Sequence, residues 1–155
     1  MNKSTTLVIA ELKTLNIEPL SLAKYFYEKE ITSHLFIQKL IYFTFLKGLK
    51  NNLLLFSEKF QAWKYGPVLR SIFDEMTNCS DLDAMFYQIP SLRRKEVIDI
   101  LESIYQKYRN CEVWDLVEES HQGPWQKARA GLSEEDISVN ELDLKDLVTF
   151  ANGQE

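Results

Sequence analysis

The sequence contains few of the residues that cross-link or interrupt small proteins, with two cysteines, five glycines and four prolines in 155 residues. Cys79 and Cys111 belong to no CxxC motif and to no Cys/His cluster, so their spacing excludes a disulfide framework and a structural zinc site. The N-terminus shows no charged segment followed by an apolar stretch and a small-residue cleavage site. These absences predict a protein of the reducing cytoplasm.

Long hydrophobic runs are missing too. The most apolar stretch, 34–49, is shorter than the roughly 20 residues that cross a bilayer, and it contains Lys39 and Lys47. We therefore expect no membrane-spanning segment.

The sequence also lacks the motifs of common nucleotide-binding and hydrolytic enzymes, since neither GxGxxG, GxSxG, HExxH nor a phosphate-binding loop occurs. His34 and His121 are the only histidines, and 87 positions separate them. A metal site, a cofactor and a catalytic residue are consequently not expected.

Charge is distributed unevenly along the chain. The net charge of −5 combines +3 over residues 1–110, with 15 basic and 12 acidic side chains, and −8 over 111–155, with 3 basic and 11 acidic side chains. Nucleic-acid binding relies on clustered Lys and Arg, and the one dense basic run, at 93–95, is typical of a solvated first helical turn. We expect no direct contact with nucleic acid.

Hydrophobic residues make up 45% of the chain and follow mainly helical spacing. Residues 1–155 contain no linker and no repeat, which predicts a single compact, mainly all-α domain. Segment 34–47 is apolar around nearly its full circumference, so it should form a buried central helix flanked by helices at 68–76 and 92–108. Two short apolar stretches around a polar break at 53–64 indicate a β hairpin or an extended excursion.

Polar and aromatic groups stand out in three places. Lys39 and Tyr42 lie within the most apolar helix, Trp63 and Tyr65 precede Gly66-Pro67, and His121 precedes Gly123-Pro124-Trp125. Both Gly-Pro pairs indicate a stop followed by a helix start. His121 has three interpretations, namely a group that caps carbonyls and packs on Trp125, a partner-binding residue, or a general base. We predict that His121 and Trp125 lie close to Lys39 and Tyr42.

Three segments resemble the signatures of the Panacea antitoxin domain, a family that includes SocA-like and phage-associated proteins. They are IQKLIYF at 37–43, FQAWKYGPV at 60–68 and SHQGPWQKAR at 120–129. Their order and separation extend the resemblance over about residues 21–150. The residues singled out by it are Lys39, Tyr42, Trp63, Tyr65, Gly66, Pro67, His121, Pro124 and Trp125.

The resemblance implies a mainly helical domain, encoded beside a toxin gene on a prophage or another mobile element. It implies a non-enzymatic antitoxin that binds its cognate toxin, either to inhibit it or to deliver it to a protease as an adaptor. Two roles remain open for the signature residues. They either contact the toxin directly or build the scaffold of the domain. The competing hypothesis is a small hydrolase or transferase that uses His121 with Tyr65 or Glu118.

Overall fold

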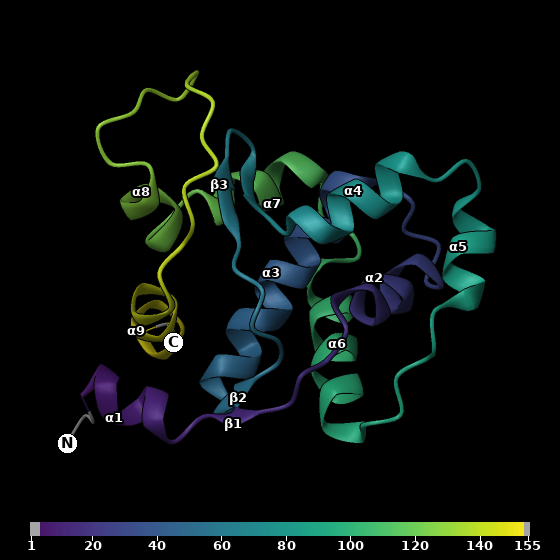
Figure 1. Cartoon of the computed structure of the whole chain (residues 1–155), viewed down its shortest axis with the longest axis horizontal. Helices are drawn as coiled ribbons and strands as arrows, with labels where there is room; N and C mark the ends of the chain where they lie inside the picture. The colour runs from purple at the N-terminus through teal and green to yellow at the C-terminus, as the bar shows by residue number, and fades with distance from the viewer. Residues whose placement is uncertain (1–3, 154–155) are drawn as a thin grey trace.

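The computed structural model describes residues 4–153, and these form nine helices and two small sheets (Figure 1). The predicted mainly all-α fold with a short hairpin is confirmed. The helices are α1 (Thr5–Ala10), α2 (Pro19–Tyr27), α3 (His34–Lys50), α4 (Arg70–Asn78), α5 (Leu82–Gln88), α6 (Lys95–Tyr108), α7 (Val113–Ser120), α8 (Pro124–Ala128) and α9 (Leu144–Gly153). The strands are β1 (Lys13–Thr14), β2 (Leu53–Leu54), β3 (Gln61–Trp63) and β4 (Gly66–Val68).

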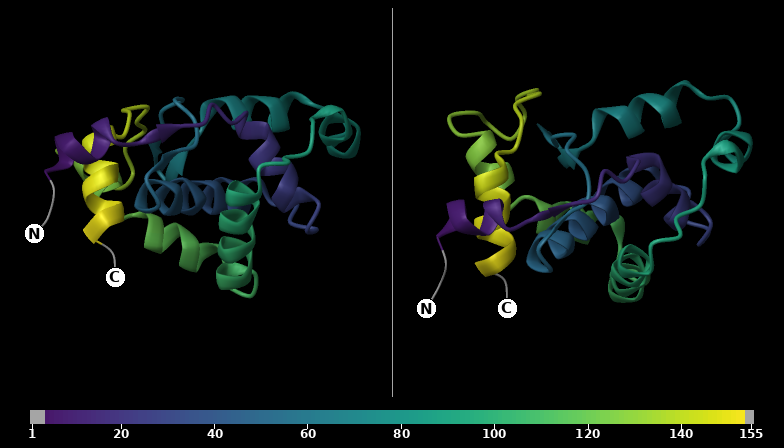
Figure 2. Two further views of the ribbon diagram at one scale, coloured as in Figure 1. Left: turned by 90° about the horizontal axis from the view of Figure 1, so that it is seen from below. Right: turned by 60° about the horizontal axis from the view of Figure 1, so that its bottom comes forward.

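Helix α3 forms the centre of the domain, as its all-round apolar sequence predicted. Ser33 caps it by accepting a hydrogen bond from the backbone N–H of Phe36, and every residue from 37 to 46 is buried. The predicted neighbours α4 and α6 both pack against α3, and so do α2, α7 and α9. Figure 2 shows α3 crossing the middle of the molecule between α6 and α9.

The hairpin consists of β3 and β4, whose antiparallel pairing places Gln61 opposite Val68 and Trp63 opposite Gly66. The first strand of the hairpin lies within the predicted 53–64 segment and the second lies just after it, because β2, at the start of that segment, instead pairs in parallel with β1. The prediction that Pro67 opens a helix is wrong. Pro67 belongs to β4, and α4 begins only at Arg70.

A third segment joins the hairpin on the outer side of β3. The backbone N–H of Ala62 donates to the carbonyl of Asn140, and the N–H of Leu142 donates to the carbonyl of Phe60. The stretch 130–143, which connects α8 to α9, is thus tied to the hairpin. We call this stretch the strap.

The two ends of the described chain meet at one side of the domain, where α1 lies beside α9 (Figure 1). The hydroxyls of Thr5 and Thr149 are 2.9 Å apart. Within residues 4–153 no helix has both the length and the hydrophobicity needed to cross a membrane.

Candidate partner-binding site

Lys39 is the buried starting point of the site. Its side chain is fully enclosed, and its Nζ donates a 2.9 Å hydrogen bond to the carbonyl oxygen of Pro67 in β4. Burial lowers the pKa of Lys39 to about 7, since an ammonium group loses its hydration inside the protein. A lysine of the central helix thereby holds the hairpin against α3.

At Gly66, α3, the hairpin and α7 come into close contact. Its φ of +113° is a conformation that L side chains rarely adopt. A Cβ at this position would lie 2.8 Å from Cε of Lys39 and would collide with the hydroxyl of Ser120. Only glycine lets the three elements pack this closely.

His121 and Trp125 form the next layer. Their rings are stacked, with centroids 3.9 Å apart and planes 8° from parallel. The indole N–H of Trp125 donates a 2.7 Å hydrogen bond to the carbonyl of Trp63, which attaches α8 to the hairpin. His121 packs on Trp125 as predicted, so the imidazole ring contributes to the local packing of the fold.

The turn between α7 and α8 allows this stacking. Gly123 has a φ of +52°, and a Cβ there would lie 2.6 Å from the ring of Phe150 in α9. Pro124 then occupies the first turn of α8, as predicted, where its missing N–H leaves no hydrogen bond unmade.

The electrostatics of His121 link it to Lys39 and to the strap. Burial lowers the pKa of His121, the charge of Lys39 lowers it further, and the charge of Glu134 opposes the shift. The imidazole is therefore mostly neutral at pH 7, and its Nε2 atom has no hydrogen-bond partner within the described chain. The side chains of Lys39 and of Ser120, the residue before His121, both lie against Gly66, an arrangement that agrees with the predicted proximity of His121 to Lys39.

Tyr42 lies one helical turn after Lys39 on α3, and its ring packs into the hydrophobic core. Its ring packs edge-on against Phe60 at 5.2 Å and against Phe43, inside the hydrophobic core. Burial raises the pKa of its hydroxyl, which finds no partner among residues 4–153. Tyr42 is a core residue in this structure.

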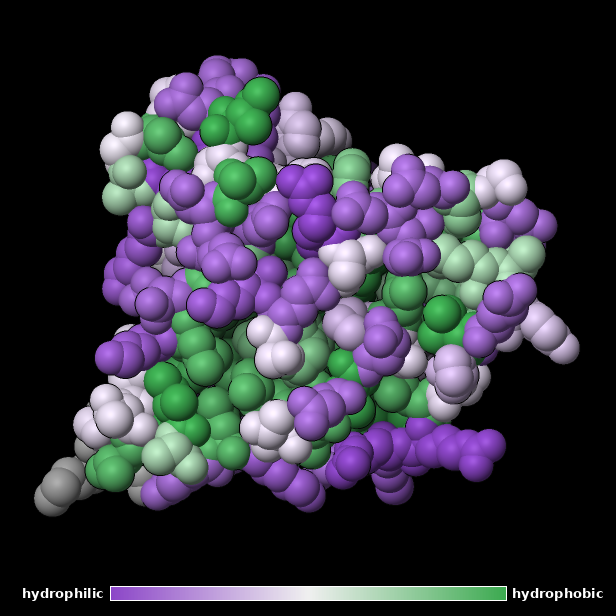
Figure 3. All heavy atoms as spheres, in the orientation of Figure 1, coloured by the Kyte–Doolittle hydropathy of each residue, from purple (hydrophilic) through white to green (hydrophobic). Residues whose placement is uncertain are grey.

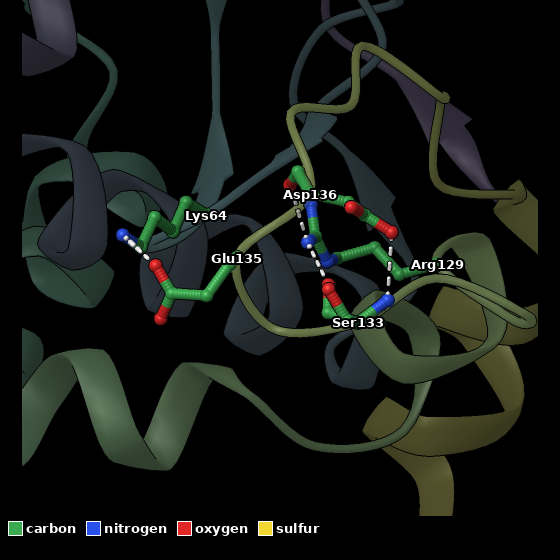
Figure 4. A network of polar contacts seen from close by, with 5 residues as sticks. All are labelled: Lys64, Arg129, Ser133, Glu135 and Asp136. Atoms are coloured by element: carbon green, nitrogen blue, oxygen red, sulfur yellow. Dashed lines mark hydrogen bonds and ion pairs between the residues drawn. The ribbon is translucent and has the colours of Figure 1, made fainter.

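Arg129 completes the support and was not among the predicted site residues. It is buried, and its guanidinium donates a 3.0 Å hydrogen bond to the carbonyl of Ala62. It also donates to the carbonyls of Ser133 and Asp136 over 2.7–3.0 Å (Figure 4). The same group lies 5.0 Å above the ring of Trp125. Because the sequence gives no sign that this arginine is buried, only its place in the third resembling segment could have indicated it.

The strap is fixed to the hairpin at its outer end as well. Lys64 Nζ and a carboxylate oxygen of Glu135 form a 2.7 Å ion pair (Figure 4). Asp136 accepts a 2.9 Å hydrogen bond from the backbone N–H of Ser133, which tightens the turn of the strap. We call Lys39, Gly66, His121, Trp125 and Arg129 the buried base.

Large apolar side chains lie exposed above this base. Tyr65, at the turn of the hairpin, is 46% exposed and meets Trp114 of α7, which is 57% exposed, with ring centroids 5.3 Å apart. On the strap, Ile137 is 94% exposed and Val139 is also exposed. We call these four residues the hairpin-tip surface. Figure 3 shows hydrophobic residues among hydrophilic ones on the strap, at the upper left.

A shallow apolar pocket of about 280 Å³ extends this surface between the hairpin and the strap. Trp63, half-buried, forms one wall, and its ring packs edge-on against Phe73 at 4.8 Å. The guanidinium of Arg70 lies 5.2 Å above the same ring, and Ile137 and Val139 line the opposite side.

The geometry defines a small helical domain that presents a braced hairpin. A family model described as antitoxin SocA-like, Panacea domain matches residues 37–126, more than half of the chain, and the chain belongs to this family. The match includes Lys39, the hairpin and Trp125, and it gives the chain an antitoxin-type role in general terms. No curated protein and no solved structure shows a significant match to the chain.

Proposed function

We propose that this protein is an antitoxin that neutralises its cognate toxin by binding it directly through the hairpin-tip surface. The observation that carries the proposal is the exposed aromatic pair formed by Tyr65, at the turn of the hydrogen-bonded hairpin, and Trp114 of α7. Large, stiff aromatic rings bury much area on binding at a small entropic cost, and they dominate binding energies at interfaces.

The support beneath the surface favours binding without a large rearrangement. The hydrogen bonds from Lys39, Trp125 and Arg129 reach the backbone of the hairpin at Pro67, Trp63 and Ala62 respectively. A surface that is already ordered loses less conformational entropy when its partner arrives.

We further propose that the protein acts stoichiometrically and not as an enzyme. Ser120 and Lys39 lie near each other around Gly66, a pairing that in other proteins can supply a nucleophile and its base. Both are buried here, and the Ser120 hydroxyl donates to the carbonyl of Val117 in its own helix. A substrate could reach them only if the hairpin moved away.

The test is co-expression with the product of the adjacent reading frame, which we call the neighbouring product and propose as the toxin. The antitoxin should restore growth and co-purify with it in a fixed ratio. Trp114→Ala should weaken the complex by about 2 kcal/mol, roughly thirtyfold, since a central aromatic anchor contributes at least this much. Binding is measured by titration calorimetry.

The matched control is Tyr87→Ala, because Tyr87 is 87% exposed on α5, away from the hairpin. It should leave binding and rescue unchanged. Equal loss in both variants would contradict the proposed surface. Rescue of growth at strongly substoichiometric antitoxin would contradict direct inhibition. If the antitoxin instead makes the toxin disappear faster, and this loss requires a host protease, the adaptor mechanism would replace direct inhibition.

A further inference from the structure

The hairpin-tip surface is surrounded by carboxylates. On α7, Glu118 is exposed four positions after Trp114 and therefore on the same side of the helix, and Asp115 is exposed next to Trp114 in the sequence. On the strap, Glu134 and Glu135 are exposed just before Ile137. The surface therefore combines an apolar centre with an acidic surround.

Few cations offset these carboxylates. Lys64 is the basic residue at the hairpin turn, and it is already engaged with Glu135 and with the ring of Tyr65, 5.4 Å from its Nζ. Arg70 lies across the pocket, against Trp63. Asp115 and Glu118 have no ion pair or side-chain hydrogen bond within the described chain. Their charges remain available to a partner.

Charge distinguishes between three kinds of occupant. A second copy of the chain, docked through the same surface, would place these carboxylates against each other, and like charges across an interface cost several kcal/mol. Nucleic acid would bring phosphates to the same groups. A protein with a basic patch fits both the apolar centre and the acidic surround.

We infer that the toxin meets the hairpin-tip surface with a basic patch that contains arginine and surrounds an apolar centre. This inference rests on the proposed function and adds the chemistry of the partner. A guanidinium can pair with Glu118 while it lies over the indole of Trp114. The chain itself uses this contact twice, with Arg70 over Trp63 and Arg129 over Trp125.

The experiment is a charge reversal measured on the complex with the neighbouring product. The double variant Glu118→Lys/Glu134→Lys should slow association and weaken binding about tenfold or more, because steering by opposite charges is lost. Raising the salt from about 0.05 to 0.5 M should weaken the wild-type complex by a similar factor and the double variant much less, since salt screens charged surfaces.

Two variants control for nonspecific effects. Glu118→Gln/Glu134→Gln removes the charges without reversing them and should give an intermediate loss. Asp99→Lys reverses a carboxylate on α6 that pairs with Lys95 at the helix surface, and it should leave binding unchanged. Loss of binding in Asp99→Lys equal to that in the double variant would overturn the inference.

The outcomes separate this inference from the proposed function. Suppose that Trp114→Ala weakens the complex, whereas charge reversal leaves it unchanged or strengthens it. Binding through the hairpin-tip surface is then supported, and the inference that the toxin has a basic patch is overturned. If neither change has an effect, both fail. Saturable binding of a single-stranded RNA oligonucleotide, lost in Trp114→Ala, would also overturn the inference.

The local charge can be tested without a partner. Trp114 is the most exposed of the three indoles, so collisional quenchers reach it first. Relative to N-acetyltryptophanamide in the same solutions, caesium ions should gain and iodide should lose quenching efficiency at Trp114, and this difference should shrink in the double variant. Equal relative quenching of the wild type by both ions would overturn the acidic surround.

Discussion

The buried base and the hairpin-tip surface differ in how their side chains are used. In the base, the polar groups of Lys39, Trp125 and Arg129 each hydrogen-bond the backbone of another element. At the surface, Tyr65 and Trp114 meet each other across two elements, and Ile137 projects into solvent. The base therefore fixes the hairpin, and the surface keeps its interaction capacity for a partner.

The difference between the buried base and the hairpin-tip surface predicts two classes of variant. Changes in the base should reduce the free energy of unfolding, because they remove contacts made within the chain. Changes at the surface should leave folding unaffected and alter only the complex, because the contacts they remove are formed on binding.

The largest effect is expected for Gly66→Ala. The new Cβ would meet Lys39 Cε at 2.8 Å as well as the Ser120 hydroxyl, at a backbone φ of +113°. Overpacking and left-handed strain each cost on the order of 1–3 kcal/mol, so we expect a loss of about 4 kcal/mol of unfolding free energy, measured by urea denaturation.

Gly131→Ala separates the two causes of that loss. Gly131 also has a positive φ, +86°, but nothing lies within 4 Å of its would-be Cβ. The control should retain only the backbone strain, about 1 kcal/mol. Equal losses in the two variants would show that the close approach at Gly66 contributes nothing.

A smaller, pH-dependent effect is expected from Lys39. Its pKa of about 7 in the fold lies below the ordinary 10.5, so between these values the unfolded chain binds the extra proton. Stability should therefore rise with pH, by about 2 kcal/mol between pH 7 and pH 9. Lys39→Met should lack this rise, which urea denaturation at both values would reveal.

The neighbouring titrating groups do not interfere in this range. His121 has its pKa lowered from 6.5, so its own contribution develops below about pH 7, and the raised pKa of Tyr42 acts only above pH 10. An identical pH profile in wild type and Lys39→Met would mean that Lys39 keeps its charge in the fold.

Much of the fold could be predicted because local signals decide it. The all-round apolar pattern identified α3 as central, and Gly123-Pro124 correctly separated α7 from α8. The prediction for Pro67 failed because a Gly-Pro pair suits both the start of a helix and the start of a strand. The hairpin pairing of Gly66–Val68 with Gln61–Trp63 decided between them, and the buried Lys39, 28 positions before Pro67, holds β4 in place. No local pattern around Pro67 contains that contact.

The candidate site was predictable only in part. The resembling segments contain Lys39, Gly66 and Trp125, and the structure brings them together. Trp114 and Ile137 lie outside those segments and carry no motif, so their exposure emerges only from the packing of α7 and the strap. Sequence reasoning found the buried base except for Arg129, and of the four residues of the hairpin-tip surface it found only Tyr65.

The smallest effect on stability is expected for Ile137→Ala. Because 94% of this side chain is already exposed, its truncation should change the unfolding free energy by less than about 0.5 kcal/mol. The complex with the neighbouring product should nevertheless weaken about tenfold, since the isoleucine would be buried on binding beside the apolar pocket. Leu7→Ala, an exposed truncation on α1, should alter neither quantity. An unchanged complex would confine the contact area to Tyr65 and Trp114, whereas a stability loss near that of Gly66→Ala would place Ile137 in the base and end the division between the two regions.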